Sequence, residues 1–596
     1  MRIPLSFLQG LIKKDILPDQ LIKILTTLGV EVEEIIKVGE EYIIGEVVEV
    51  EKKEQAAILS INTGKGLLRT VTGFMEIKSG QKVVVAPAGS YIFRKNGQIK
   101  SVEPVNMYGI VSECVVCSPG EAALNGNFST LLFVSDGFEP GTPASKVIPH
   151  LSDIILDISI TPDKGYLLGI DNIAREIAMF LNLRNSEVTI PQIQEYDFSS
   201  FSQENIRITI EHPDCISYTA FPVSISGWNI DLSRIHSLLI KYGMGIENPA
   251  VDIANYVMIR TGQPIHVFPI EVFKAKECYH ILTGRIDGNT TITALDGKSY
   301  TITGDDILIM NEKRDVLCLA GIIGTKEYAV HSHHRYFLYE IASFSPVRIR
   351  KTARRLGLGT EASYRFERYS NLYAIQQATS MLAALYSAIS GSKFFSPVTA
   401  GAAYQKKHIT ISLSKISKII NGNEDYRTKD YPRIINLTTG RIIKASGDTL
   451  TVELLPEKTF INNENDIAEE ILRFIDMNSV EEAPPVPSCN NYQMSDTYAY
   501  HNIMKLKQIL KGMGFIEFHG LSLIQQGNTT SLYVVNPQNR EYPCLRSSLL
   551  FSGIPVVKSN ISRGNTSFKI FEVGRIWQKT DGHIKDCLLY TSDAAD

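Results

Sequence analysis

The sequence predicts a multidomain α+β protein, and three observations support this fold class. With 596 residues, the chain is too long for one hydrophobic core, and domains of roughly 100 to 200 residues would give about four of them. Strand-like runs rich in Val, Ile and aromatic residues are interleaved with stretches of helical spacing. Hydrophobic residues make up 44% of the chain and charged residues 21%, which is close to the average for globular domains.

The composition argues against two other classes of protein. No apolar run approaches the roughly 20 residues that a membrane-spanning helix needs, and residues 1–15 lack the core and cleavage site of a signal peptide. We therefore expect no membrane insertion and a cytoplasmic location. The formal net charge of −4 excludes a globally basic nucleic-acid binder. Any RNA contact must come from a local patch, and a solvated basic face is an equal alternative for the patch formed by Arg348, Arg350, Lys351, Arg354 and Arg355.

The cysteines do not indicate a disulfide framework. The chain has 8 of them, widely scattered, and only Cys114 and Cys117 have the spacing of a metal-binding or redox pair. Tetrahedral zinc needs two more ligands, and the suggestive histidines at 331–334 belong to an unrelated region. We therefore expect buried structural thiols rather than a zinc site.

Local patterns predict the elements in chain order. Residues 42–88 alternate short Val- and Ile-rich runs with Gly- and Lys-containing turns, which predicts a small closed barrel of the OB-fold type. From about 200 to 395 a mixed domain follows, with strands and helices predicted at 206–210, 284–286, 232–242 and 373–390. A smaller unit has helical spacing at 412–423 and an amphipathic helix at 466–475. A Pro-rich linker at 484–487 precedes a long helix at 492–513 and then strands.

The segment 336–368 is the most informative part of the chain. Aromatic and branched residues predict a strand over 336–344, and Glu340 places one carboxylate inside it. Such a charge must face water or find a buried partner. Ser345 is a favoured N-cap, Pro346 is favoured at the first helical position, and Gly357 is a stop signal, so we predict a helix over 346–356. Strand, basic helix and Gly-Thr turn together suggest a site.

Several blocks of the sequence resemble the beta subunit of bacterial phenylalanyl-tRNA synthetases. The segment 338–368, together with 251–257 and 262–268, is similar to the editing region of that family. The blocks 25–35, 157–164 and 168–178 resemble the two halves of its split N-terminal domain. The matching blocks follow the family's order across most of the chain, which a chance match to one motif would not produce.

The resemblance implies a domain arrangement. A split N-terminal α+β domain would occupy 1–39 and 151–198, and an inserted OB-fold similar to a tRNA-binding module would occupy 40–150. A mixed α/β editing domain of the B3/B4 type would follow at 199–398. A small helical or winged B5-like domain would occupy 399–484, and a partial class II synthetase-like antiparallel core would occupy 490–586. The core lacks a recognisable Phe-Arg-x-Glu arrangement, so we expect it to be catalytically degenerate. Residues 587–596 fit nothing in the family, and we expect a truncated chain with a non-native tail.

The resemblance also implies an editing pocket. Phenylalanine and tyrosine differ by one hydroxyl, and an apolar pocket rejects an added hydroxyl only by roughly a hundredfold. We hypothesise that Glu340 rewards that hydroxyl with a charge-assisted hydrogen bond, worth about 1.5–3 kcal/mol, so that tyrosine is removed and phenylalanine escapes. Residues matching the family motif would form the rest of the pocket: Asn255 and His266 on the opposite wall, Gly321 and Gly324 near backbone amides, and Thr360 and Ala362 at the floor.

Hydrolysis in this pocket would depend on a positioned water, backbone donors and the terminal hydroxyl of the tRNA, because no Ser-His-Asp or Cys-His constellation is visible. His266 would orient that water. A satisfied core histidine and an edge-strand carboxylate in water are the simpler interpretations of His266 and Glu340. Two departures from the family motif, at Pro269 and Tyr369, would alter the edges of the pocket.

The family also suggests a magnesium site. Asp466, Glu469 and Glu470 share one helical face. At the position where the family has a fourth carboxylate, this chain has Phe460. A solvated acidic face is the alternative.

Taken together, these patterns predict the beta subunit of a phenylalanine-tRNA ligase. The resemblance implies an alpha2beta2 heterotetramer in which the alpha subunit uses ATP and Mg²⁺ to charge tRNA(Phe), and the beta subunit hydrolyses mischarged Tyr-tRNA(Phe). A freestanding deacylase of mischarged tRNA and a noncatalytic RNA-binding scaffold are the alternatives. Partner dependence separates them, since a degenerate core and a long helix at 492–513 would be idle without an alpha chain.

Overall fold

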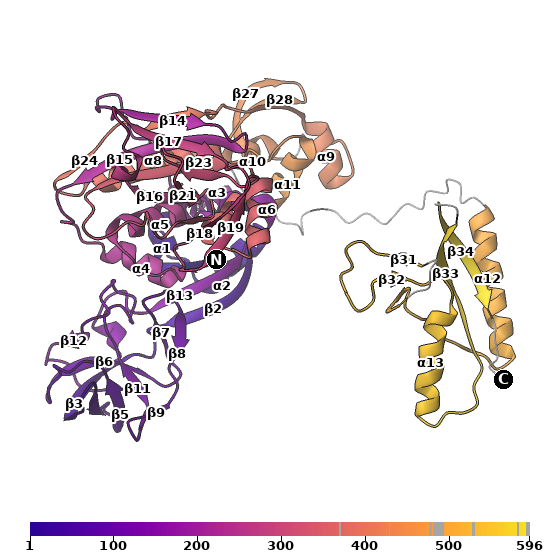
Figure 1. The fold of residues 1–596 in the computed structure, drawn as a ribbon, viewed down its shortest axis with the longest axis horizontal. Coiled ribbons are helices and arrows are strands. Elements are labelled where there is room, and N and C mark those ends of the chain that lie inside the picture. Colours follow the sequence, from indigo (N-terminus) through magenta and orange to yellow (C-terminus); the bar gives the residue numbers. More distant parts are fainter. Residues whose placement is uncertain are drawn as a thin grey trace. The chain divides into compact units, whose positions relative to one another are not determined.

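The computed structural model describes residues 1–368, 371–427, 429–475, 480, 494–526, 531–580 and 583–591. The predicted linker at 484–487, Tyr369 and the last five residues of the predicted tail lie outside this part of the chain. Two compact units, Met1–Glu481 and Glu482–Asp596, are described separately. Strands and helices are mixed in both units, as the α+β prediction requires (Figure 1). None of the helices in the described ranges is long and apolar enough to cross a membrane.

The first unit begins with a sheet built from two distant parts of the sequence. Strands β1 (Arg2–Pro4) and β2 (Glu31–Val38) pair on either side of β13 (Asp153–Ser159). The chain leaves this sheet at Gly39, directly after β2. Glycine is required there, because φ is +72° and a Cβ would lie 2.2 Å from the carbonyl oxygen of Leu151. The helical elements that follow the strands are α1 (Leu5–Ile12), α2 (Pro18–Thr27), η2 (Pro162–Leu168) and α3 (Ile170–Leu183).

The intervening segment forms the predicted small barrel. The main sheet has the order β11-β6-β3-β4-β5, and its two edges meet where the Glu113 amide donates to the Arg69 carbonyl (2.9 Å) and Thr70 Oγ1 donates to the Cys114 carbonyl (2.6 Å). The strands and one short helix of this segment are β3 (Ile43–Lys52), β4 (Ala57–Asn62), β5 (Leu67–Thr72), β6 (Lys82–Pro87), β7 (Tyr91–Phe93), β8 (Ile99–Ser101), β9 (Val105–Met107), β10 (Ile110–Ser112), β11 (Cys114–Val116), β12 (Phe133–Val134) and η1 (Ala144–Lys146).

Cys114 and Cys117 are buried free thiols, as predicted. Burial raises the pKa of Cys114 to about 12 and raises that of Cys117 well above its ordinary value. Both side chains therefore stay protonated and serve as small apolar groups of the barrel interior.

Two sheets face each other in the large mixed region. The first has the order β16-β23-β15-β24, with β25 also paired to β15, and the second has the order β14-β17-β20-β21-β22. Their bounds are β14 (Ile206–Ile210), β15 (Cys215–Ile225), β16 (Ile265–Pro269), β17 (Tyr279–Gly284), β20 (Leu308–Met310), β21 (Val316–Leu319), β22 (Ile323–Gly324), β23 (Tyr336–Phe344), β24 (Ser392–Phe394) and β25 (Val398–Gly401), and a separate hairpin comprises β18 (Asn289–Thr293) and β19 (Ser299–Thr303). The strand predicted at 284–286 is wrong beyond Gly284, where β17 ends.

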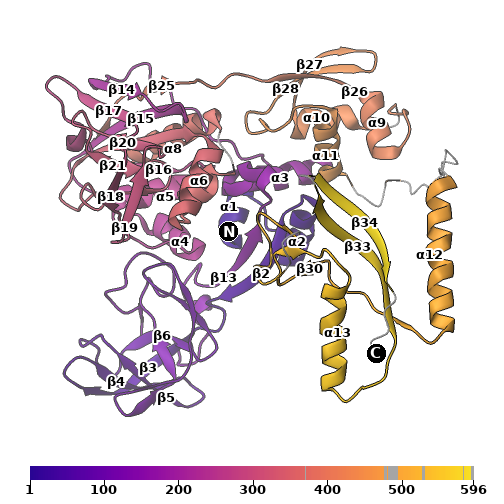
Figure 2. The same ribbon diagram turned by 45° about the vertical axis from the view of Figure 1, so that its right-hand side comes forward.

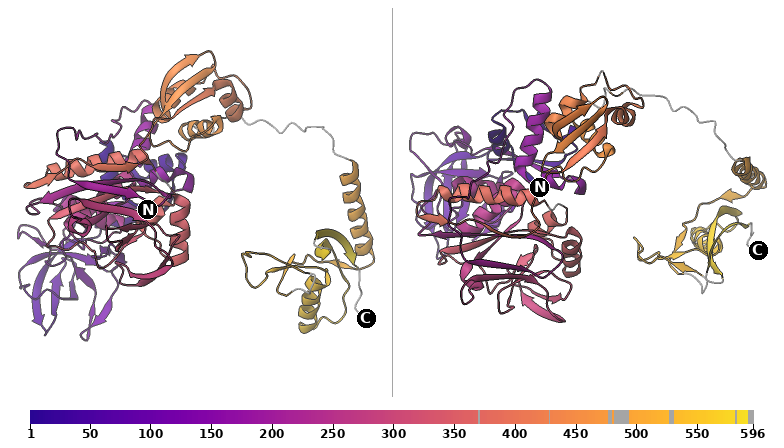
Figure 3. Two further views of the ribbon diagram at one scale, coloured as in Figure 1. Left: turned by 45° about the horizontal axis from the view of Figure 1, so that its top comes forward. Right: turned by 90° about the horizontal axis from the view of Figure 1, so that it is seen from above.

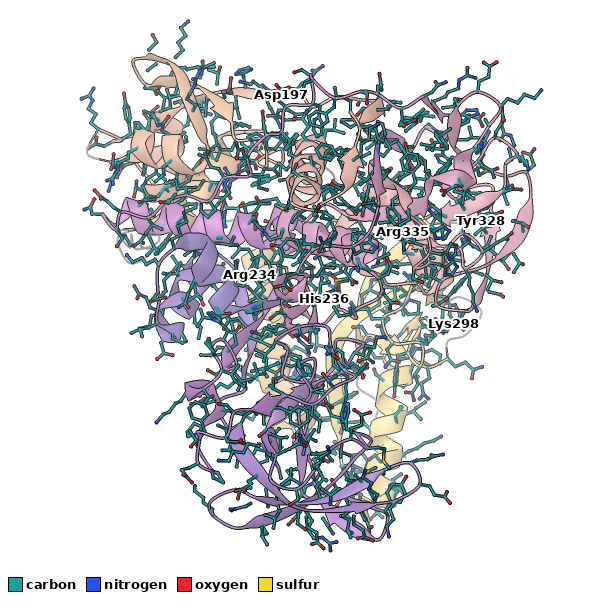
Figure 4. All side chains as sticks on the ribbon, turned by 90° about the vertical axis from the view of Figure 1, so that its left-hand side faces the viewer. Asp197, Arg234, His236, Lys298, Tyr328 and Arg335 are labelled. Carbon is teal, nitrogen blue, oxygen red and sulfur yellow. The ribbon has the colours of Figure 1, made fainter. Side chains whose placement is uncertain are left out.

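Helices cover the outer face of the first sheet. Helix α8 runs along this sheet (Figures 1 and 3). Alternate residues of β23, namely Phe337, Tyr339 and Ile341, share one hydrophobic core with residues of α5 and α8. The helical elements here are α4 (Ser233–Tyr242), α5 (Pro249–Thr261), η3 (Ile270–Phe273), α6 (Pro346–Leu356), α7 (Glu361–Phe366) and α8 (Leu372–Ser387). The predictions of β23 and α6 are confirmed, whereas α8 ends three residues before the predicted 390. His236 of α4, labelled in Figure 4, lies with Nε2 3.3 Å from Asp252 Oδ2 of α5.

The last part of the first unit is a three-stranded sheet with three helices beside it (Figure 2). The Ser412 side chain accepts a bond from the Lys415 amide and caps the first of these helices, as its sequence position suggests. The elements are β26 (His408–Ser412), α9 (Leu413–Asn421), α10 (Tyr431–Thr438), β27 (Gly440–Ser446), β28 (Thr449–Leu454) and α11 (Glu464–Phe474).

The second unit contains the predicted long helix, α12, which spans Met494–Gly512. In this unit Arg546 and Glu572 form a buried ion pair of 2.7 Å. The other elements are β29 (Ile516–Glu517), β30 (Leu523–Ile524), β31 (Leu532–Tyr533), β32 (Cys544–Leu545), α13 (Leu550–Ser562), β33 (Ile570–Thr580) and β34 (His583–Thr591). Strand β34 pairs with β33 and runs into the segment from 587 that we expected to be a non-native tail.

Candidate functional site

The site is built on the central strand of the first sheet. Glu340 of β23 lies directly opposite His266 of β16 in the antiparallel register, so the two side chains leave the sheet on the same side. That side faces the second sheet, because Leu338, Ala342 and Phe344 of the same strand pack in the core between the two sheets. Glu340 is only 4% exposed. The interpretation of Glu340 as an edge-strand carboxylate in water is therefore wrong, since β23 has a neighbour on each side.

A small cavity lies against these two side chains. Its volume is about 50 Å³. Four of the seven predicted pocket residues, Glu340, His266, Gly321 and Ala362, line it. The other lining residues are Pro264, Ile265, Cys318, Ile322, Ile323 and Phe366.

The remaining three predicted residues lie at different distances from the cavity. Gly324 packs against the ring of His266, and a Cβ at this position would lie 2.7 Å from His266 Cε1. Thr360 caps α7, and its hydroxyl donates to the carbonyl of the lining residue Ile322 (2.9 Å). Asn255, which we expected on the opposite wall, belongs to α5 and does not line the cavity. The helix covers the other face of the sheet, which explains the difference.

The carboxyl group of Glu340 is held by a phenol from the protein itself. Tyr218 of β15 donates its hydroxyl to Glu340 Oε2 (3.1 Å). Burial raises the pKa of Glu340 to about 8, and the Tyr218 bond opposes that rise. Glu340 is therefore mostly protonated at pH 7, which corrects our assumption of a charged carboxylate. A protonated carboxyl group still offers one acceptor and one donor to a ligand hydroxyl.

His266 is the second polar group of the cavity. Burial lowers its pKa to about 4, so the imidazole is neutral at physiological pH. A neutral ring has one nitrogen that donates and one that accepts. This arrangement suits the orientation of a water molecule.

Cys318 is the third polar group of the cavity, and no sequence pattern indicated that it shares a cavity with His266. Its thiol contacts the carbonyls of Leu319 and Ile323, each at 3.4 Å. Burial, with a smaller contribution from Glu340, raises the pKa of Cys318 well above its ordinary value. Because the thiolate is the nucleophilic form, Cys318 does not serve as a nucleophile at neutral pH.

The cavity is smaller than a phenol ring. An apolar cavity of roughly 150 Å³ accommodates benzene, whereas this one has about 50 Å³ and takes only a few waters. Phe366 of α7 and three isoleucines, Ile265, Ile322 and Ile323, are the bulky lining side chains. A tyrosyl ring can enter only if side chains of this kind move.

Gly324 offers a direct test of the packing behind the cavity. In Gly324→Ala we expect the methyl group to push the His266 ring, since the clash distances are 2.7 and 2.8 Å, and to cost about 1–3 kcal/mol of stability. Thermal unfolding measures this loss. Gly227→Ala is the matched control, because a Cβ at Gly227 meets nothing within 4 Å. Equal unfolding midpoints for the two variants would contradict the packing described here.

The predicted magnesium ligands do not meet as a metal site. Glu470 is fully buried and binds Lys164 (2.8 Å), Lys458 (2.6 Å) and Arg473 (2.8 Å). Asp466 accepts bonds from the Asn462 and Asn463 amides at the start of α11.

Cations of this chain take the place that a metal ion would need. Glu469 binds Lys164 Nζ (2.9 Å), and Lys164 also lies 4.6 Å above the ring of Phe460. Within the described ranges, no group of three or more His, Cys, Asp or Glu side chains could hold a metal. The donor set therefore does not fit a magnesium ion.

Comparison with known proteins gives the class first. Residues 224–391, which include β23, α6 and α7, match the model of the B3/4 domain. Residues 484–587 match that of the phenylalanyl tRNA synthetase beta chain CLM domain. The chain is thus a subunit of an aminoacyl-tRNA synthetase.

Its relatives give the family. The chain is 28% identical to the phenylalanine--tRNA ligase beta subunit of Thermotoga maritima, over 98% of this chain and 74% of that protein. It is 27% identical to the subunits of Bacteroides fragilis (97% and 72%) and Staphylococcus haemolyticus (99% and 75%). An N-terminal fragment of the beta subunit from Pyrococcus horikoshii aligns with 80% of this chain and 99% of its own, with 11% identity and a TM-score of 0.36. The chain belongs to the family of phenylalanine--tRNA ligase beta subunits.

Proposed function

We propose that this beta subunit hydrolyses Tyr-tRNA(Phe) in the cavity between Glu340 and His266. One observation supports this most directly. The buried carboxyl group of Glu340 already accepts a phenolic hydroxyl, from Tyr218, on Oε2. Its Oε1 has no protein partner among the described residues, and Glu340 lines the cavity. A tyrosyl hydroxyl of the substrate would take that second oxygen.

The reaction needs little more than positioning. Water attacks the ester carbonyl, the bond between the acyl carbon and the ribose oxygen breaks, and the ribose hydroxyl leaves with a proton. Neutral His266 would hold the attacking water. Phenylalanine lacks the hydroxyl and leaves the Glu340 carboxyl without its ligand partner, which disfavours its binding.

We further propose that the chain works with an alpha subunit as an alpha2beta2 heterotetramer, in which the alpha subunit uses ATP and Mg²⁺ to charge tRNA(Phe). The names of its relatives as beta subunits support this. Co-purification with a co-expressed alpha chain tests it. A chain that stays alone and still deacylates Tyr-tRNA(Phe) would establish the freestanding hydrolase instead.

The editing assay compares hydrolysis of preformed Tyr-tRNA(Phe) and Phe-tRNA(Phe) by the parent complex and by Glu340→Ala. We expect selective hydrolysis of Tyr-tRNA(Phe), and a loss of up to roughly tenfold in the variant, because a hydrogen bond to the neutral carboxyl group, worth about 0.5–1.5 kcal/mol, disappears. Glu312→Ala, an exposed carboxylate of the same region, is the control. Aminoacylation should be unchanged in both variants.

A second function is favoured by the size of the cavity. Its volume of about 50 Å³ is too small for a phenol ring, which is what we would expect in a beta subunit that does not edit. Normal aminoacylation by the parent complex without hydrolysis of Tyr-tRNA(Phe) would establish this noncatalytic role.

A further inference from the structure

A larger recess opens on the far side of helix α7 from the Glu340 cavity. Its volume is about 600 Å³, and it is bordered by α6, the Gly357–Gly359 turn and α7. Arg350 and Arg354 of α6 and Arg368 after α7 line it, together with the half-exposed ring of Tyr364. Neither family membership nor the proposed hydrolysis assigns a role to this recess.

Helix α6 divides its cations into two groups. Arg348 binds Asp214 (2.8 Å), and Arg355 binds Asp306, so both guanidinium groups tie the helix to the domain. Arg350 and Arg354 are exposed and lie one helical turn apart on the recess side. No ion pair or hydrogen bond engages either guanidinium among the residues that the structure describes. Their charge is therefore available to a ligand.

The carboxylates of the recess are already matched. Glu361 is bound by the buried Arg365 and by Tyr242 (2.9 Å). Glu367 binds Arg368 (2.8 Å), whose guanidinium also stacks 3.5 Å from the centre of the Tyr364 ring. The unmatched charge of the recess is thus positive. Two free arginines beside a stacked arginine and tyrosine are suited to phosphate groups and to unpaired bases.

Helix α7 separates the recess from the Glu340 cavity by its own thickness. Ala362 and Phe366, four residues apart, face the cavity, whereas Thr360, Ser363 and Tyr364 face the recess. An amino acid bound in the cavity is joined by an ester to the last ribose of its RNA. The nearest phosphate of that RNA is only a few bonds from this ester, so it can reach the recess past α7, whose diameter is about 10 Å.

We propose that this recess binds the 3′ end of the tRNA, with Arg350 and Arg354 as ligands of its last phosphates. The inference rests on the proposed editing function, because the cavity gives the RNA end its position. It changes the interpretation of the basic patch on α6. Two of the five cations are structural, two are phosphate ligands, and Lys351 is a solvated charge outside the recess.

Binding of a fluorescein-labelled RNA oligonucleotide ending in CCA to the alpha-beta complex tests the proposal, because it needs no hydrolysis. For Arg350→Ala/Arg354→Ala we expect a Kd roughly tenfold higher at low salt and a salt slope lower by about 2, one for each lost phosphate contact. Lys351→Ala is the matched control on the same helix and should bind like the parent. Arg350→Lys/Arg354→Lys should recover part of the affinity.

Two further measurements separate this proposal from the editing function. If the complex binds the oligonucleotide through the two arginines but does not hydrolyse Tyr-tRNA(Phe), only the editing function fails. If the double alanine variant binds like Lys351→Ala, the recess proposal is overturned, whatever the hydrolysis rate. Competition by orthophosphate or AMP as effectively as by the unlabelled oligonucleotide would also overturn it, since the recess would then be a site for small anions.

Discussion

Lys458→Met is expected to destabilise the first unit by about 3–5 kcal/mol, because it removes one partner of a buried ion cluster. Lys458 is 1% exposed. Its Nζ donates to Glu176, to Glu470 (2.6 Å) and to the hydroxyl of Tyr166 (2.7 Å). Arg473 completes the cluster through Glu176 and Glu470, each at 2.8 Å. Methionine has a similar length but leaves buried carboxylate oxygens without their cation.

The cluster joins α11 to α3 and to the turn before it, so its loss should separate the small β26–β28 region from the N-terminal sheet. Thermal unfolding of the full chain is the measurement, and for a unit of this length we expect its transition to fall by roughly 3–5 °C. Lys415→Met, which removes an exposed ion pair of 3.6 Å with Glu464, is the control and should cost at most about 1 kcal/mol. EDTA should leave the parent transition unchanged. Equal shifts for the two methionine variants, or a parent transition lowered by EDTA, would refute this account.

The cluster also makes the stability of the first unit depend on pH in the acid range. Burial alone would raise the pKa of Glu470, but Lys458, Arg473 and Lys164 lower it well below its ordinary value. A lowered pKa in the folded state contributes stability that is present above the unfolded value, about 4.3, and is lost as the pH falls toward the folded value. The first unit should therefore lose this contribution below pH 4.

Glu340→Gln is expected to stabilise the first unit at alkaline pH. The pKa of Glu340 is about 8 in the folded protein and about 4.3 in the unfolded chain, so between these values the folded state holds a proton that the unfolded state has lost. Stability then falls as the pH rises through this window. At pH 8 and above the difference amounts to about 5 kcal/mol at most. Glutamine keeps the shape of the side chain and removes the ionisation.

Unfolding midpoints of the parent and Glu340→Gln at pH 4.5 and pH 8.5 test this prediction. We expect nearly equal midpoints at pH 4.5 and a higher midpoint for the variant at pH 8.5. Glu312→Gln, an exposed glutamate of the same region, should show neither effect. A difference between parent and Glu340→Gln that is the same at both pH values would mean that Glu340 does not titrate as described.

Local signals explain what the sequence could predict. Pro346 and Gly357 bound helix α6 at the expected residues, and the aromatic and branched run over 336–344 forms β23. Glycine and proline act through backbone geometry of their own positions, and strand patterns act through neighbouring residues. Such features need no knowledge of distant parts of the chain.

Long-range pairing explains what the sequence could not predict. The Tyr218 hydroxyl reaches Glu340 only because β15 pairs with β23. The local sequence around either residue does not predict this strand pairing. The predicted magnesium ligands failed for the same reason. Glu470 has the right spacing on α11, but Lys164 and Lys458, from other elements, neutralise it. Asn255 was placed by resemblance alone, and the helix that carries it covers the opposite side of the sheet.

The contact between Gly39 and Leu151 has a consequence for the order of folding. Strand β13 must find β1 and β2 after the whole barrel has been synthesised, and the entropy of closing a loop grows with the logarithm of its length. A folded barrel holds its two ends together, since the Gly39 backbone touches the Leu151 carbonyl. The remaining search for β13 then spans a few residues instead of the full insertion. The folded barrel therefore keeps β2 and β13 close together. We expect it to fold first and to set the rate at which the N-terminal sheet forms.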